Sequence, residues 1–151
     1  MTTPSRDPIV IERVLDASIG DVFAAFGDAE SLAIWMAPAP DMGPATVETE
    51  FRVGGAFRIV MHGKEGDFAQ HGEYLEIEAP RRIVFTWVSE WVPPDERDTT
   101  KVTVLLEPAS GNRTLLRLVH EDITAFYNDH ENGWETIVSK LERALGQGEK
   151  S

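Results

Sequence analysis

The chain contains no cysteine, which excludes disulfides, thiolate nucleophiles and cysteine-ligated metals from its chemistry. Positive charge is also scarce. Only 14 lysines and arginines stand against 26 aspartates and glutamates, so the formal net charge is −12 at pH 7. A nucleic-acid surface or an anionic membrane needs clustered basic side chains, so we expect neither as a partner.

Long apolar runs are missing as well. No stretch approaches the roughly 20 consecutive apolar residues of a membrane span. The first residues, MTTPSRDP, lack the apolar segment of a secretory signal. We therefore expect no membrane insertion and a cytoplasmic location. A length of 151 residues with 42% hydrophobic residues suits one domain with one core, which we assign to residues 1–151.

The last part of the chain has the strongest helical pattern. Residues 128–145 predict a helix in which His130 lies one turn before Trp134 on the same face. Gly146 suits a left-handed residue after the helix, so we expect the helix to end there. The large apolar residues recur at three- and four-residue spacing and share one face: Trp134, Ile137, Val138, Leu141 and Leu145. This face needs a partner that covers it.

The preceding sequence supplies mostly strands. Residues 9–15 form a β-branched run, and Ser18 and Asp28 are expected to cap two short helices, the first ending at Gly27. Six strand-like runs separated by turn signals follow at residues 47–53, 57–61, 68–77, 83–87, 102–106 and 116–120. In the first of these runs, we expect Val47, Phe51 and Val53 to share one face.

Strands that follow one another at this spacing are typical of hairpins and therefore of an antiparallel sheet. We predict an α+β fold in which a curved antiparallel sheet of about seven strands surrounds the long C-terminal helix. Two short helices follow the first strand. Alternation along the strands implies one dry face, which the long helix must cover.

Four segments carry a resemblance to a known family. They are SLAIWMAP around Trp35, FRVGGAFRIVM at residues 51–61, HGEYLEIEAPRRIVFTW at residues 71–87, and HENGW at the start of the last helix. In this order they resemble the START-like (SRPBCC) superfamily with its helix-grip fold. More narrowly, they resemble the branch related to the C-terminal domain of the activator of heat-shock-protein-90 ATPase. The resemblance covers about residues 9–146, where we expect the folded core.

This resemblance implies a deep cavity between the C-terminal helix and the curved sheet, in which members bind or process hydrophobic molecules. It carries over no catalytic residue. Our leading hypothesis is that the protein binds a hydrophobic or amphipathic small molecule. This hypothesis predicts a cavity of at least about 300 Å³. The residues expected to line it are Trp35, Met36, Ile59, Met61, Phe85, Trp87, His120, His130, Trp134 and Val138.

The histidines leave two interpretations open. His120 alternates with Leu116 and Leu118, so we expect it to point inward. It could orient a ligand or act as an acid and base. The favoured interpretation is structural, with the imidazole bonded to a main-chain carbonyl or to a carboxylate such as Glu121 or Asp122. The spacing from His120 to His130 matches no compact metal motif, so neither a metal nor another cofactor is expected.

Two further functions stay open. One is a polyketide-cyclase-like or hydrolase-like enzyme that uses an inward histidine, although no G-x-S-x-G, H-E-x-x-H or Walker sequence occurs. The other is a chaperone-interacting module, which predicts an exposed apolar patch. Trp91 lies in a proline-rich loop, where it is either a lid over the cavity or an exposed side chain. The expected oligomeric state is a monomer or a homodimer.

Overall fold

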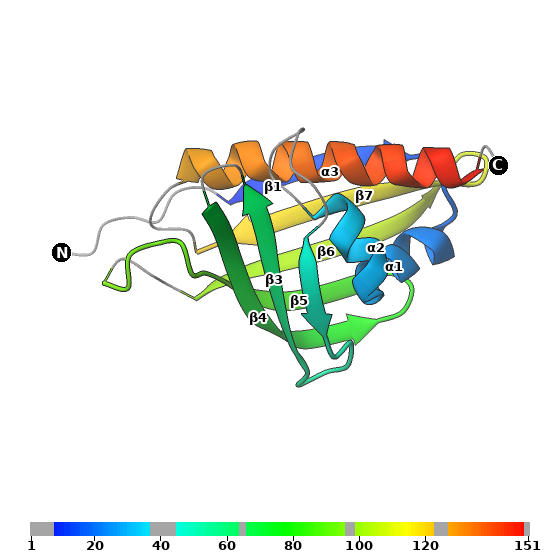
Figure 1. Cartoon of the computed structure of the whole chain (residues 1–151). Coiled ribbons are helices and arrows are strands. Elements are labelled where there is room, and N and C mark those ends of the chain that lie inside the picture. Colours follow the sequence, from blue (N-terminus) through cyan, green and yellow to red (C-terminus); the bar gives the residue numbers. More distant parts are fainter. Residues whose placement is uncertain (1–7, 37–44, 64–65, 96–98, 123–126, 150–151) are drawn as a thin grey trace.

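The computed structural model describes residues 8–36, 45–63, 66–95, 99–122 and 127–149, without the side chains of residues 127–130, 132 and 146–149. In this part, one strand and two short helices are followed by six strands and a long helix (Figure 1). The elements are β1 (Ile9–Leu15), α1 (Ile19–Gly27), α2 (Ala29–Trp35), β2 (Thr46–Thr49), β3 (Ala56–Gly63), β4 (Gly66–Glu78), β5 (Arg82–Ser89), β6 (Thr100–Ala109), β7 (Arg113–Glu121) and α3 (Tyr127–Glu149).

The strands form one antiparallel sheet in the order β1-β7-β6-β5-β4-β3-β2. From β2 to β7 each strand pairs with the next along the chain, whereas β1 pairs with β7. Figure 1 shows α3 running along one side of the curved sheet, with α1 and α2 near one end. The predicted α+β class and its helix-grip arrangement are confirmed.

Alternation along the strands places the core where the sequence predicts it. Val102, Val104, Leu116 and Leu118 face inward and are at most 1% exposed. On β3 the inward residues are Phe57, Ile59 and Met61, which are also buried. These side chains form the apolar face of the sheet. Helices α1, α2 and α3 pack over this face and exclude water from it.

Strand β2 is shorter than predicted. It ends at Thr49, and the chain then turns, with the Arg52 amide donating to the Glu50 oxygen over 2.8 Å. Gly54 has a φ of 84°, which an L side chain rarely adopts. Val53 is consequently 59% exposed, so the expectation that Val47, Phe51 and Val53 share a strand face is wrong. Phe51 nevertheless packs on the core from the turn.

Helix α3 is longer than predicted, because it begins at Tyr127 and continues past Gly146 to Glu149. The predicted end at Gly146 is therefore wrong. The apolar face is confirmed: Trp134, Ile137, Val138 and Leu141 are buried, and Leu145 packs against the core while partly exposed. A glycine can adopt helical dihedrals at a cost of about 1 kcal/mol relative to alanine, so Gly146 does not by itself end a helix.

Polar contacts fasten α3 to the first strand. The Arg13 guanidinium of β1 lies 3.1 Å from a carboxylate oxygen of Glu142 and 3.4 Å from one of Glu135. Arg13 also donates to the Ser139 hydroxyl over 3.4 Å. The side chain of Arg13 thereby bridges the rim of the sheet to the half-exposed side of the helix.

The two short helices begin at their predicted caps. The Ser18 hydroxyl accepts from the Asp21 amide over 3.2 Å, and the Asp28 carboxylate accepts from the Ser31 amide over 3.3 Å. The indole of Trp35 donates to the Ala25 oxygen over 3.3 Å, which joins α2 to α1. The two helices therefore meet the sheet as one unit.

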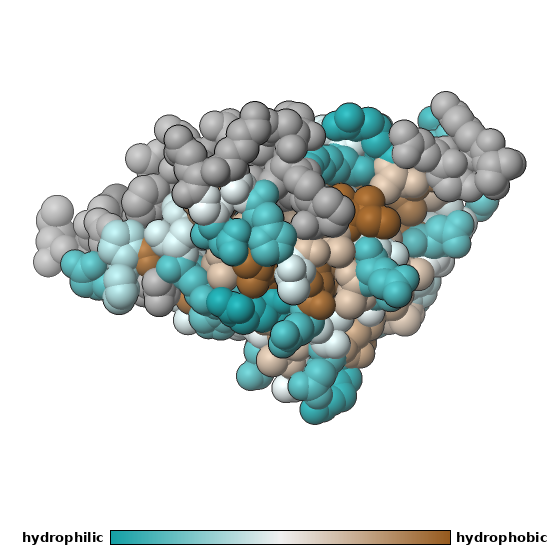
Figure 2. Space-filling view, in the orientation of Figure 1, coloured by the Kyte–Doolittle hydropathy of each residue, from teal (hydrophilic) through white to brown (hydrophobic). Residues whose placement is uncertain are grey.

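The surface combines hydrophilic and hydrophobic residues. Figure 2 shows a face on which hydrophilic residues surround smaller hydrophobic areas. The large apolar side chains exposed in the described residues come from β1, α2, the turn after β2, and β4: Val10, Val14, Ile34, Val53, Phe68 and Leu75. Among the described helices, none is long and apolar enough to cross a membrane.

Candidate ligand-binding site

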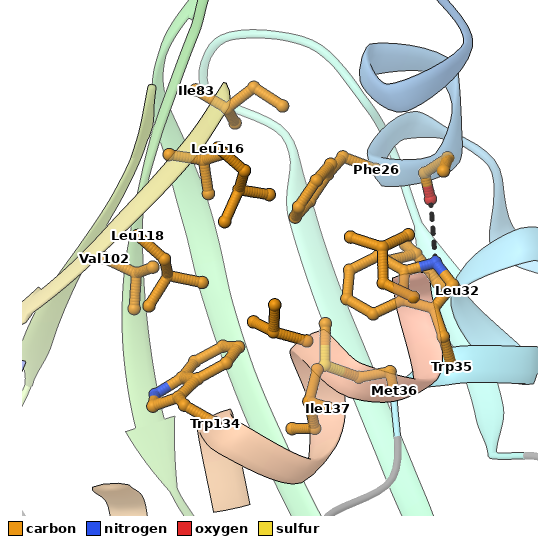
Figure 3. Close-up of a cluster of buried hydrophobic side chains, with 14 of the residues drawn as sticks. Phe26, Leu32, Trp35, Met36, Ile83, Val102, Leu116, Leu118, Trp134 and Ile137 are labelled. Atoms are coloured by element: carbon orange, nitrogen blue, oxygen red, sulfur yellow. Dashed lines mark hydrogen bonds between the residues drawn. The ribbon is translucent and has the colours of Figure 1, made fainter. Parts of the chain in front are cut away.

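A small cavity lies in the core between the short helices and the middle of the sheet. Its walls come from α1, α2, and strands β3, β4 and β5. Figure 3 shows several of these side chains pointing toward one another from the helices and the sheet. The lining residues are Phe26, Leu32, Met36, Phe57, Ile59, Tyr74, Ile83, Phe85 and Trp87.

Aromatic rings form most of the sheet side of this cavity. Phe57 lies edge-to-face with Phe85 at a centroid distance of 5.4 Å and is tilted against Tyr74 at the same distance. Trp87 continues the row, with its centroid 5.0 Å from that of Trp134 on α3. Such pairs contribute about 0.5–1.5 kcal/mol each beyond their buried area, so they hold this wall in one arrangement.

This cavity is small. Its volume is about 20 Å³, which is enough for about one water molecule. A ligand site usually measures about 300 Å³ or more. The space enclosed by these residues is therefore too small for such a ligand in this conformation, and binding requires the lining side chains to move apart.

Among the described lining residues, Tyr74 contributes the only hydroxyl. Its ring is 4% exposed, and its oxygen lies 2.6 Å from the Thr49 hydroxyl of β2. Burial raises the pKa of the Tyr74 phenol above its usual value, while the Thr49 hydrogen bond acts in the opposite direction. The phenol is therefore uncharged at neutral pH and is available for hydrogen bonding.

His120 is fully buried on β7, and both ring nitrogens have partners. The Trp134 indole donates to His120 Nδ1 over 2.8 Å, so Nδ1 carries no proton. Thr100 Oγ1 donates to the Trp87 main-chain oxygen over 2.6 Å and lies 2.7 Å from His120 Nε2. Because the hydroxyl has one proton, it accepts from Nε2–H, and the network assigns a neutral imidazole.

This network supports the structural interpretation of His120. The inward orientation of His120 is as predicted. Its ring bonds to a hydroxyl and an indole, whereas the sequence predicts a bond to a carbonyl or a carboxylate. His120 is also not among the residues that line the cavity. A general base needs a lone pair within reach of the substrate proton, and the Nδ1 lone pair already accepts from Trp134.

The structure groups the predicted site residues into three sets. Four line the cavity: Met36, Ile59, Phe85 and Trp87. Five others are buried in the core beside it: Trp35, Met61, His120, Trp134 and Val138. His130 lies on α3, but its side chain is outside the described residues. Trp91 is half-buried and does not line the cavity, so its role as a lid stays a prediction.

Five lining residues were not predicted as site residues: Phe26, Leu32, Phe57, Tyr74 and Ile83. Strand alternation already marks Phe57 and Ile83 as inward, but it does not show which inward residues meet at a cavity. Tyr74 could have been found only with the register of β4, where it pairs with Phe85 before a bulge.

Two other histidines lie in polar clusters on the surface. His62 Nε2 lies 2.8 Å from the Thr46 hydroxyl, and its Nδ1 lies 2.9 Å from Asp67. His71 Nδ1 lies 2.7 Å from Glu90. Across the described ranges, no three histidine or carboxylate side chains are grouped so that they could hold a metal ion.

The fold and the cavity define the class of this protein as a helix-grip domain of the START-like type. The chain belongs to the family described as Activator of Hsp90 ATPase homolog 1-like protein, whose sequence model matches residues 16–146. The membership and the fold support a ligand-binding domain. None of the curated proteins matches this chain in sequence.

Solved structures of similar proteins agree with this assignment. A protein from Arthrobacter aurescens, solved in solution, is 27% identical with a TM-score of 0.80, covering 97% of this chain and 93% of its own. Protein CV1439 from Chromobacterium violaceum is 25% identical with a TM-score of 0.78, covering 93% and 98%. CalU16 from Micromonospora echinospora is also 25% identical, with a TM-score of 0.68 and coverage of 93% and 76%.

Proposed function

We propose that this chain binds a small hydrophobic molecule in the core between α1, α2 and strands β3 to β5. The observation that carries this proposal is the cavity lining. Most of the lining residues that the structure describes are purely apolar, and none of these is charged. A concave apolar site with one or two convergent polar groups is typical of small-molecule binding. The ligand-binding character that the family and the fold support agrees with this proposal.

The small volume sets a condition on binding, because the ligand must widen the cavity. Most of the lining side chains are held by packing alone, so a change of rotamer breaks no hydrogen bond of theirs. Met36 at the end of α2 is unbranched and adapts easily to a new shape. The measured affinity is then the intrinsic affinity multiplied by the fraction of molecules that are open.

The test is a thermal-unfolding screen against diverse hydrophobic small molecules. A ligand present at about a hundred times its dissociation constant adds about 2.7 kcal/mol to the free energy of unfolding. In a protein of this size the melting temperature then rises by about 5–11 °C. Tryptophan emission provides a second signal, because Trp87 lines the cavity and Trp134 lies against it.

A matched pair of variants tests where the ligand binds. Ile59 lines the cavity, whereas Ile11 is equally buried on β1 and does not. Both Ile59→Phe and Ile11→Phe overfill the core at a cost of about 1–3 kcal/mol. We expect only Ile59→Phe to weaken a screening hit, by at least tenfold. Equal binding to both variants would place the ligand elsewhere.

A screen without any hit would overturn the proposal in its present form. The chaperone-interacting alternative would then be the next to test, by purifying the tagged protein from its native lysate. Enrichment of a heat-shock-protein-90 chaperone that is lost on replacing exposed apolar residues such as Val10 and Val14 with serine would support that alternative.

A further inference from the structure

The lining of the cavity holds very few hydrogen-bonding groups. Among the described residues that line it, only Trp87 and Tyr74 carry a side-chain N–H or O–H, and only the Tyr74 side chain can both donate and accept. Its hydroxyl lies 2.6 Å from Thr49 Oγ1, where β2 forms the edge of the sheet. Tyr74 is therefore the residue that brings a hydroxyl to the otherwise apolar described lining, and Thr49, which does not line the cavity, is its hydrogen-bond partner.

The pair retains hydrogen-bonding capacity beyond the bond that joins it. Two hydroxyls contain two protons, and their mutual bond uses one of them. If Thr49 donates, the Tyr74 proton is available to a carbonyl oxygen. If Tyr74 donates, its remaining lone pair accepts from a ligand hydroxyl. The pair can thus adapt to a ligand that carries either group.

Aromatic neighbours keep the Tyr74 ring in place. The centroid of Phe51 lies 5.1 Å away with its ring nearly perpendicular, and those of Phe57 and Phe85 lie 5.4 and 6.1 Å away. The hydroxyl therefore has a defined direction, which is what a group that orients a ligand needs.

The described surroundings of the cavity disfavour charged ligands. Among the described lining residues none is ionised at neutral pH, because the only titratable one of them, Tyr74, has its pKa raised by burial. The nearby His120 is neutral, and both of its ring nitrogens are engaged. A carboxylate or an ammonium group placed here would lose its hydration without gaining a counter-ion from the described lining residues, which strongly opposes binding.

We propose that the site selects uncharged, mostly apolar molecules carrying one hydroxyl or carbonyl group, and that Tyr74 orients this group while Thr49 positions the Tyr74 hydroxyl. The inference rests on the function proposed above and specifies the chemical class of its ligand. In this scheme Tyr74 contacts the ligand directly, and Thr49 acts through Tyr74.

Four probes of nearly the same shape test this selection: para-xylene, para-cresol, para-tolualdehyde and para-toluate. Their dissociation constants are measured by calorimetry, with tryptophan emission as a second readout. We expect para-cresol and para-tolualdehyde to bind about 3- to 10-fold more tightly than para-xylene, as one added hydrogen bond predicts. We expect para-toluate to bind at least tenfold more weakly than para-cresol.

The variants Tyr74→Phe and Thr49→Val identify the group responsible. Tyr74→Phe should remove the preference for para-cresol over para-xylene while leaving para-xylene within twofold of its original affinity. Thr49→Val should reduce the preference without abolishing it. Circular dichroism and melting curves without ligand exclude misfolding, and Thr46→Val, on the same strand but bonded to His62, is the matched control.

The outcomes separate this inference from the proposed function. If para-xylene binds as well as para-cresol, or if the preference survives Tyr74→Phe, the selection by Tyr74 is refuted while binding in the core still stands. If para-toluate binds most tightly, a cationic group faces the site and the inference is also wrong. If no probe binds and the broader screen is also negative, the proposed function fails as well.

Discussion

Replacing Thr100 with valine tests the buried chain of hydrogen bonds that holds α3 against the sheet. Valine has nearly the same shape as threonine, so the change removes the hydroxyl without opening a cavity. Thr100 is 7% exposed, so water has little access to the groups left behind. The Trp87 oxygen loses its donor, and His120 Nε2–H loses its acceptor.

The expected cost follows from these two groups. Removing the hydrogen-bond partner of a buried donor costs up to about 1–3 kcal/mol, and the loss of a donor to a carbonyl, which has two lone pairs, costs less. We therefore expect the free energy of unfolding to fall by about 2–4 kcal/mol. For a chain of this length this lowers the melting temperature by roughly 4–16 °C.

Two other threonines serve as controls in urea-unfolding and calorimetric measurements. Thr114 is fully buried, but its hydroxyl bonds only to the Ala17 oxygen over 2.7 Å, so Thr114→Val should cost about 0.5–1.5 kcal/mol. Thr103 is half-buried on β6, and within the described ranges its side chain makes no hydrogen bond. Thr103→Val should leave the stability nearly unchanged.

The reasoning is refuted if Thr100→Val costs no more than Thr114→Val. Nitrogen NMR of the histidine ring provides an independent check, because the network requires the proton of His120 on Nε2. A proton on Nδ1 in the wild-type protein would contradict the assigned network directly.

Two further predictions follow from local geometry and from charge. Gly72→Ala should lower the free energy of unfolding by about 3 kcal/mol or more, because a Cβ there would lie 1.9 Å from the Thr86 main-chain oxygen. Gly20→Ala on α1, with free space around it, should raise the free energy of unfolding by about 0.5 kcal/mol. Equal melting temperatures for the two variants would contradict this prediction. The Arg58 guanidinium lowers the pKa of Glu90 from 4.5 to about 2. The unfolded chain then takes up this proton first on acidification, so the stability contributed by Glu90, complete above pH 4.5, is lost as the pH falls toward 2. Glu90→Gln should flatten this part of the curve of unfolding free energy against pH, and an unchanged curve would refute the assignment.

Much of the fold is predictable because its signals are local. Ser18 and Asp28 begin the short helices as their residue types predict, since a cap is a contact within one turn. The inward residues of β6 and β7 follow from alternation alone. The predicted strand through Val53 is wrong, because the alternation of apolar residues continues through a turn. This turn is formed by main-chain hydrogen bonds within residues 50–55.

The candidate site is only partly predictable, because part of it depends on contacts between segments that are far apart in the chain. Ile59, Phe85 and Trp87 were predicted because they alternate toward the core, and they do line the cavity. Tyr74 was not, because its place depends on the pairing of β4 with β5 and on the bulge that follows it. The volume of the described cavity is not predictable from the sequence either, because a volume depends on how side chains from several elements fill the space between them.

The sequence by itself determined the order and type of the elements, the buried face of the final helix and membership of the family, because periodicity, capping and motif order are properties of neighbouring residues. Only the tertiary structure decided the partners of His120 and the size of the cavity. Thr100, His120 and Trp134 lie on three different elements, and their contacts depend on the strand register and on how α3 docks. Distances of this kind are set by packing between segments that are far apart in the chain.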